Sequence, residues 1–456
     1  MRPTIPGTAR RVLGAGSAIA LAVSLIGGPV AAQDPVVMMS TQLAPEAEAQ
    51  KMRDAILAGF DGSVEFVAAD PASLLIDTIR AEAQAGTGDV SLAGALHGEL
   101  STLGAEGLLM DLSDLAAELD VNEDFLELGK LGTDQQLYIP WMQATYLMAA
   151  RADALEYLPE GADINALTWD QITEWGANLQ AATGDRLLGF PAGEDGLIHR
   201  LFQGFLYPAF TGGVNTHFAD QSAVDMWDWL KDTWQYVNPQ STTYGFMQEP
   251  LQSGEVSVAW DHTARLIEAL RNDPEGFVVF PVPAGPAGRA FMPVIAGLAI
   301  PNTAPDPEAA KDVIRHLLDP ATQGVTLQQV AFFPVVTGEV QAELDAGTQA
   351  ELDAVAAQTG AADALPALLP VALGDQGGAY NDVFKNALTQ IIVDGGDPAT
   401  VLAGLAPSLQ AVFDSTGAAC WPPDPASDGP CPVGTGEAMP EGSPMAEEAA
   451  EESPAA

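Results

Sequence analysis

Residues 36–93 decide the fold class. They contain three short apolar segments, VVMMS (36–40), VEFV (64–67) and DVSLA (89–93). The segments between them, 45–60 and 71–85, carry apolar side chains at helical spacing. Strands that alternate with helices predict a mainly parallel sheet with helices on its faces. Ligands of such sheets bind beyond the carboxyl ends of the strands, which places Thr41, Gln42, His97 and their neighbours at a candidate site.

A secretory signal peptide is predicted ahead of this region. Arg2, Arg10 and Arg11 precede an apolar run over 12–26, and small residues close it at 30–32 (VAA). This order of a basic head, an apolar middle and a small-residue end is typical of a cleaved export signal. A membrane anchor is disfavoured because the run is short and broken by Gly and Ser. We predict cleavage after residue 32 and a periplasmic or extracellular location.

The length and charge of the chain limit its domain organisation and its partners. A chain of 456 residues exceeds what one hydrophobic core usually organises, so two lobes are expected. Its 62 acidic residues face only 17 basic ones, for a formal net charge of −45. That balance excludes nucleic acid and anionic membrane surfaces as partners, because both require clustered Lys and Arg. It leaves open solubility in a saline or acidic exterior and attraction of a cationic ligand.

The two cysteines, Cys420 and Cys431, lie near the C-terminus. In an exported protein such a pair predicts a disulfide, and the absence of a nearby His argues against a metal site. They belong to an acidic tail over 419–456 that is rich in Pro, Glu and Ala. The composition from residue 434 onward is too polar for a packed core, so we expect that part to be disordered.

No catalytic motif is found in the chain. The zinc-protease, nucleophile-elbow and phosphate-loop patterns are all missing. The five histidines lie scattered without ligand spacing, at His97, His199, His217, His262 and His316. We therefore predict no enzyme activity, no cofactor and no metal. A secreted glycoside hydrolase stays open as an alternative, because so many acids could supply a pair of catalytic carboxylates.

Six short motifs follow one another along the rest of the chain. They are QLYIPW (136–141), TWDQI (168–172), SGEVSVAWD (253–261), PVPAGPAG (281–288), GLAIP (297–301) and AAKDVIRHLL (309–318). Their order over about residues 34–415 resembles that in the extracellular solute-binding proteins of ABC importers, family 1. This is the sugar-binding, maltose-binding-protein-like group.

The resemblance implies a two-lobe periplasmic-binding-protein fold of the α/β class, similar to type II. The ligand cleft would lie between the lobes, which three hinge crossings would join. The first crossing would follow residue 141, the second would lie near 293–301 and the third would follow 334. Lobe 1 would comprise 33–142 and 298–336, and lobe 2 would comprise 143–297 and 337–418.

The resemblance also implies which residues contact the ligand. Sugar recognition needs aromatic faces for the C–H surface and planar polar groups for the hydroxyls. Family members place such groups after the first-lobe strands, at the hinge and after the strand of the SGEVSVAWD motif. Tyr380 lies where some members place a stacking aromatic. The implied ligand residues are Gln42, His97, Trp141, Gln143, Trp260, Asp261 and Tyr380.

The expected function is therefore capture of a sugar or oligosaccharide and its delivery to the permease subunits of an ABC importer. The protein would be monomeric. Binding proteins for polyamines and other small cations share the two-lobe shape and favour acidic clefts, so they are the nearest alternative.

Overall fold

Five strands form the first sheet of the computed structural model, which describes residues 34–71 and 73–434. β1 pairs in parallel with β2 and β3, as the alternating pattern predicts, but β10 joins antiparallel to β3 and β4, so the pairing in this sheet is mixed and not mainly parallel. The sheet order is β2-β1-β3-β10-β4. The strands are β1 (Val36–Ser40), β2 (Val64–Ala68), β3 (Leu92–Leu96), β4 (Ile139–Ala144) and β10 (Val294–Ala299).

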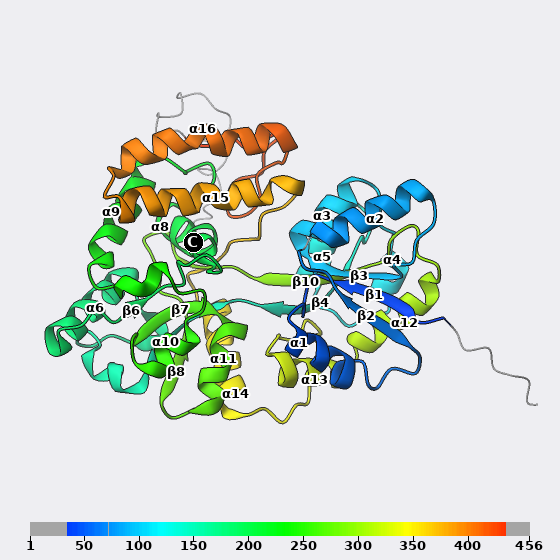
Figure 1. The fold of residues 1–456 in the computed structure, drawn as a ribbon, viewed down its shortest axis with the longest axis horizontal. Helices are drawn as coiled ribbons and strands as arrows, with labels where there is room; N and C mark the ends of the chain where they lie inside the picture. Colours follow the sequence, from blue (N-terminus) through cyan, green and yellow to red (C-terminus); the bar gives the residue numbers. More distant parts are fainter. Residues whose placement is uncertain (1–33, 72, 435–456) are drawn as a thin grey trace, which may run out of the picture. The chain divides into compact units, whose positions relative to one another are not determined.

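Helices cover both faces of this sheet, with α2 and α3 on one face and α12 and α13 on the other (Figure 1). Together they form the first lobe. The predicted signal peptide and residues 435–456 lie outside the described residues. The first-lobe helices are α1 (Glu46–Lys51), α2 (Ser73–Ala85), α3 (His97–Ala105), α4 (Ser113–Ala116), α5 (Glu123–Gly129), α12 (Pro307–Leu317) and α13 (Pro320–Val330).

A second sheet, of order β6-β7-β5-β8, organises the second lobe. β5 runs antiparallel to β7 and β8, while β6 is parallel to β7. A separate parallel pair joins β9 and β11. The strands are β5 (Tyr146–Arg151), β6 (Leu188–Gly189), β7 (Val258–His262), β8 (Phe277–Phe280), β9 (Arg289–Phe291) and β11 (Ala364–Pro366).

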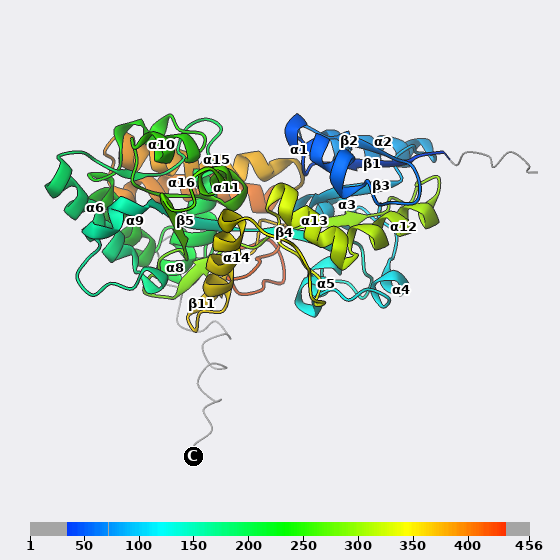
Figure 2. The same cartoon turned by 90° about the horizontal axis from the view of Figure 1, so that it is seen from below.

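The second lobe carries the longest helices. The predicted TWDQI motif forms the start of α6, where Thr168 accepts the amide of Gln171 and the Gln171 side chain accepts the amide of Thr168. α15 and α16 lie side by side (Figures 1 and 2). The helices are α6 (Trp169–Thr183), α7 (Ile198–Leu201), α8 (Tyr207–Thr211), α9 (Gln221–Trp234), α10 (Gln248–Ser253), α11 (Thr263–Asn272), α14 (Ala346–Thr359), α15 (Gly377–Leu388) and α16 (Pro398–Thr416).

Three chain segments cross between the lobes, and hydrogen bonds tie them together. The first crossing is Thr145, the single residue between β4 and β5, and its hydroxyl donates to the carbonyl of Met292 at 2.9 Å. Met292 opens the second crossing, between β9 and β10. The third passes Phe333, whose amide donates to the carbonyl of Gln143 at 2.7 Å. The expected lobe boundaries at 142/143 and 297/298 fall inside β4 and β10. The exact division of the chain between the lobes stays a prediction.

Candidate ligand-binding site

A cavity of about 570 Å³ is lined by residues from both lobes. The first lobe contributes the start of α2 and the start of α3, and the second contributes α7, the start of α15 and the loop before it. Thus four separate parts of the chain meet at one site. The lining residues are Ser73, Ile76, Asp77, Arg80, Leu96, Gly98, Glu99, Thr102, Arg200, Leu369, Pro370, Leu373, Gly374, Asp375, Gly377, Gly378 and Asn381.

Glu99 provides the main acceptor on the first-lobe wall. It lies in the first turn of α3, and its Oε2 accepts the amide of Leu96 at 2.9 Å and the hydroxyl of Thr41 at 2.8 Å. The Leu96 side chain cannot cap the helix, so the carboxylate of Glu99 satisfies that amide instead. Burial raises the pKa of Glu99, and these hydrogen bonds and the charge of Arg200 oppose the shift. Oε1 accepts no hydrogen bond from the described residues.

Arg200 provides the main donor on the second-lobe wall. Its Nη1 donates to Oε1 of Gln203 at 2.8 Å, and Nε2 of Gln203 donates to Oδ1 of Asn381 at 2.9 Å. A guanidinium can only donate, which fixes the orientation of both amides. The amide nitrogen of Asn381 therefore stays available to a ligand. Burial lowers the pKa of Arg200, because the charged form loses hydration.

Two glycines keep the wall open at the start of α15. A Cβ atom added at Gly377 or Gly378 would meet no atom within 4 Å. The first turn of a helix carries amide groups without intrahelical partners, so this end of the cavity favours acceptor groups of a ligand.

The amino-acid sequence matches a known family over residues 46–324, that of the bacterial extracellular solute-binding proteins. The chain belongs to this family. No curated protein sequence matches this solute-binding protein.

Solved structures with the same fold include three binding proteins. UgpB from Mycobacterium tuberculosis, in complex with glycerophosphocholine, is 20% identical at a TM-score of 0.64, over 84% of this chain and 99% of that one. Maltose-bound MalE3 from T. maritima is 16% identical at a TM-score of 0.65, over 83% of this chain and 99% of that one. A chitin oligosaccharide binding protein is 17% identical at a TM-score of 0.65, over 83% of this chain and 99% of that one. At these identities the likeness concerns the fold, and it confirms the predicted two-lobe α/β architecture.

The predicted first-lobe residues lie beside the cavity lining. Gln42 is partly exposed and donates from Nε2 to the hydroxyl of Thr41, which itself binds Glu99. His97 lies between lining residues 96 and 98, but its side chain is buried and Nδ1 lies 2.7 Å from the hydroxyl of Tyr138. Burial lowers the pKa of His97 to about 4, so it is neutral at physiological pH.

The predicted hinge residues lie on β4, just before the first crossing. Trp141 is fully buried, and its carbonyl accepts Nε2 of Gln323 at 2.7 Å. Nε2 of Gln143 donates to the carbonyl of Pro334 at 3.0 Å, which links the first crossing to the third. The Gln143 side chain therefore joins two of the crossing regions, and the Trp141 side chain is part of the hydrophobic core.

The predicted aromatic and acidic cluster on β7 is packed inside the second lobe. Trp260 is 0% exposed and stacks on Tyr146, with ring centroids 4.7 Å apart. Asp261 is also 0% exposed and accepts the amides of Met247 and His262, both at 2.8 Å. Burial raises the pKa of Asp261 to about 6 against the attraction of Arg265.

Tyr380 is buried next to the cavity wall, and its hydroxyl donates to Oδ1 of Asn215 at 2.9 Å. Burial raises its pKa well above the ordinary range. None of the seven predicted residues lines the cavity in this structure, and their contact with a ligand stays a prediction. Sequence reasoning missed Glu99, Arg200 and Asn381. The one available signal was Glu99, an acid three residues after a strand end, which is typical of a helix start.

A disulfide joins Cys420 and Cys431, and the segment it closes packs into the second lobe. Trp421 is buried and contacts the rings of Tyr380 and Phe413. The sequence assigned this segment to a tail, but its apolar side chains instead cover α15 and α16. The described part of this segment therefore supports the helix that carries Asn381.

The described residues hold no group of three or more His, Cys, Asp or Glu placed to bind a metal ion. Among the same residues, no helix is long and apolar enough to cross a membrane.

Proposed function

We propose that this solute-binding protein captures a sugar or small oligosaccharide in the cavity between its lobes and delivers it to the permease of an ABC importer. The observation that carries the proposal is the cavity itself, whose polar groups come from both lobes. Glu99 offers a carboxylate oxygen from one wall, and Arg200 and Asn381 offer donors from the other. A polyhydroxylated ligand can bind all three, because each hydroxyl both donates and accepts.

The cavity volume suits one or a few sugar rings. Its lining contains no aromatic residue, so hydrogen bonds rather than ring stacking would hold the ligand in this arrangement. A ligand bound by both walls stabilises the approach of the lobes about the three crossings, which is the hinge closure of periplasmic binding proteins.

The lining holds the carboxylates of Asp77, Glu99 and Asp375 beside the guanidinium groups of Arg80 and Arg200, so charge alone does not decide against the polyamine alternative. We propose that the protein has no catalytic activity, since capture and release require only binding. We also propose export by the signal peptide, function outside the cytoplasm and a monomeric state, with the permease subunits as its protein partners.

Filling the cavity should abolish binding. Gly378→Trp places an indole in open space at the start of α15, where it occupies the volume that a ligand needs. A thermal-shift screen of sugars identifies a ligand of the wild type, since ligand at 100 times its dissociation constant adds about 2.7 kcal/mol. Calorimetry on Gly378→Trp should then show affinity reduced by at least about tenfold, or 1.4 kcal/mol.

Gly404→Trp is the matched control. Gly404 is also a helical glycine with no atom within 4 Å of a built Cβ, but it lies on α16 outside the lining. Its affinity should equal that of the wild type. Unchanged affinity in Gly378→Trp would place the ligand elsewhere and contradict the proposed site.

A further inference from the structure

Arg200 is a cation at the cavity that no carboxylate contacts. Its side chain is only partly exposed, and no carboxylate of the described residues forms an ion pair with it within 4.0 Å. The charge of Glu99 attracts it from a longer distance. Arg80, on the opposite wall, instead pairs with Glu106 at 2.5 Å and Asp77 at 3.6 Å. Charged groups are rarely removed from water without a counter-charge. A partly buried arginine that no carboxylate contacts, in a ligand cavity, therefore indicates that a negative group of the ligand binds there.

The groups around Arg200 also favour an anion. The chain of hydrogen bonds from Arg200 through Gln203 to Asn381 leaves Nη2 and Nε of the arginine and the amide nitrogen of Asn381 without acceptors among the described residues. Gly378 adds the start of α15, a twelve-residue helix, at the same wall. This wall thus offers donors, and a carboxylate or phosphate has the several acceptor oxygens needed to satisfy them.

The acids in the lining set the orientation of such a ligand. Glu99, Asp77 and Asp375 are the carboxylates that line the cavity. Asp77 pairs with Arg80, and Asp375 accepts Nε2 of Gln376 at 3.1 Å. Glu99 keeps Oε1 free and repels an anion, but it accepts hydroxyl protons. A negative group would therefore lie at the Arg200 wall, with the hydroxyl-bearing part of the ligand toward Glu99.

We propose that the ligand is a polyhydroxylated acid, a sugar or polyol that carries one carboxylate or phosphate, with its anionic group bound by Arg200 and Asn381 and its hydroxyls bound by Glu99. This inference rests on the proposed function, because it takes the cavity as the sugar site and names the class of sugar.

Calorimetry with matched pairs of probes tests the inference. Glucuronate and glucose 6-phosphate are each compared with glucose, and galacturonate with galactose, on the protein without its signal peptide. At least one acid should bind more tightly than its neutral parent. Which acid binds distinguishes a carboxylate ligand from a phosphate ligand.

Arg200→Gln removes the charge and should weaken that acid by about 10- to 150-fold, the range for a hydrogen bond between charged groups. The same variant should weaken the neutral parent by a smaller factor than the acid, about 2- to 12-fold, which is the range for a neutral hydrogen bond. Arg200→Lys keeps the charge and should restore part of the affinity. Arg186→Gln is the control, because Arg186 also lacks an ion pair among the described residues but lies outside the lining. It should leave the affinity unchanged.

Either of two results would overturn the inference. The first is that no acid of the panel binds more tightly than its neutral parent. The second is that Arg200→Gln weakens the acid and its parent by the same factor. If only a neutral sugar binds and Gly378→Trp abolishes that binding, the proposed function stands, but the inference that the ligand is an anion is wrong. If cavity-filling has no effect on any ligand that binds, both fail.

Discussion

Asp424→Ala should lower the free energy of unfolding by about 3–5 kcal/mol, the cost of breaking a buried hydrogen-bond network. The carboxylate is 3% exposed and lies inside the disulfide-closed segment. It accepts the amides of Val214, Asn215 and Thr216, together with the side chains of the latter two, at 2.6–3.1 Å. Alanine leaves these buried donors without an acceptor, and each such group costs about 1–3 kcal/mol.

Asp428→Ala provides the comparison for this variant. Asp428 is exposed in the same disulfide-closed segment, so its loss should change stability by no more than about 0.5 kcal/mol. Urea unfolding of the oxidised protein measures both variants. Similar small effects for Asp424→Ala and Asp428→Ala would show that the segment merely covers the surface.

The Asp424 network has a consequence for the ligand site. Asn215, which Asp424 holds, accepts the hydroxyl of Tyr380, and Tyr380 precedes Asn381 on α15. The disulfide segment therefore positions the helix that offers an amide to the ligand. Residues 420–434 are therefore part of the second lobe and not a tail.

The fold was predictable because periodicity is a local property of the chain. The segments 36–40 and 64–67 form β1 and β2, and the helix expected over 71–85 is α2. The third strand was expected at 89–93 but pairs over Leu92–Leu96. Its apolar run continues to residue 96, and only sheet pairing decides which part of such a run forms the ladder.

The candidate site could not be predicted in the same way. Glu99, Arg200 and Asn381 lie far apart in the chain and meet only because α3, α7 and α15 border one cavity. The burial of Trp260 depends likewise on Tyr146 and Phe205, which come from other elements. A tryptophan at the end of a strand has the same local pattern whether it faces a cleft or packs on another ring.

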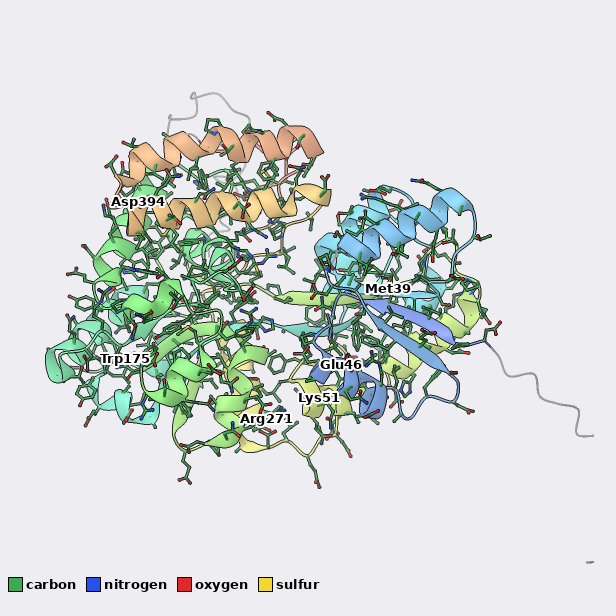
Figure 3. All side chains as sticks on the ribbon, in the orientation of Figure 1. Met39, Glu46, Lys51, Trp175, Arg271 and Asp394 are labelled. Atoms are coloured by element: carbon green, nitrogen blue, oxygen red, sulfur yellow. A yellow bond between two sulfur atoms is a disulfide. The ribbon has the colours of Figure 1, made fainter. Side chains whose placement is uncertain are left out.

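Glu351→Met should raise the free energy of unfolding by about 3 kcal/mol at pH 8, because a buried polar group without a partner costs about 1–3 kcal/mol and ionisation adds to that cost. Glu351 lies on α14 and is 0% exposed, and neither carboxylate oxygen has a hydrogen-bond partner among the described residues. Arg271 on α11, labelled in Figure 3, attracts this charge but directs its guanidinium to Asp345 and Thr348 instead. Methionine has a similar length and fills the site without a charge.

The pH dependence distinguishes this burial from ordinary packing. Burial raises the pKa of Glu351 well above its ordinary value of 4.5, against the attraction of Arg271. Above that pH the folded protein holds a proton that the unfolded chain has released. Each further pH unit then lowers the unfolding free energy by about 1.4 kcal/mol until the folded-state pKa is reached. The stability that Glu351 contributes in its protonated form is fully present below about pH 4.5 and is lost as the pH rises toward the folded-state pKa.

Urea unfolding of the wild type and Glu351→Met between pH 4.5 and 8 should therefore give a stability difference that grows with pH. Asp353→Met on the same helix is the control, because Asp353 is exposed and its replacement should change stability by no more than about 0.5 kcal/mol at every pH. A difference for Glu351→Met that is constant with pH would mean that the carboxyl titrates equally in the folded and unfolded chain. Water or a charged group would then have to reach it between α11 and α14.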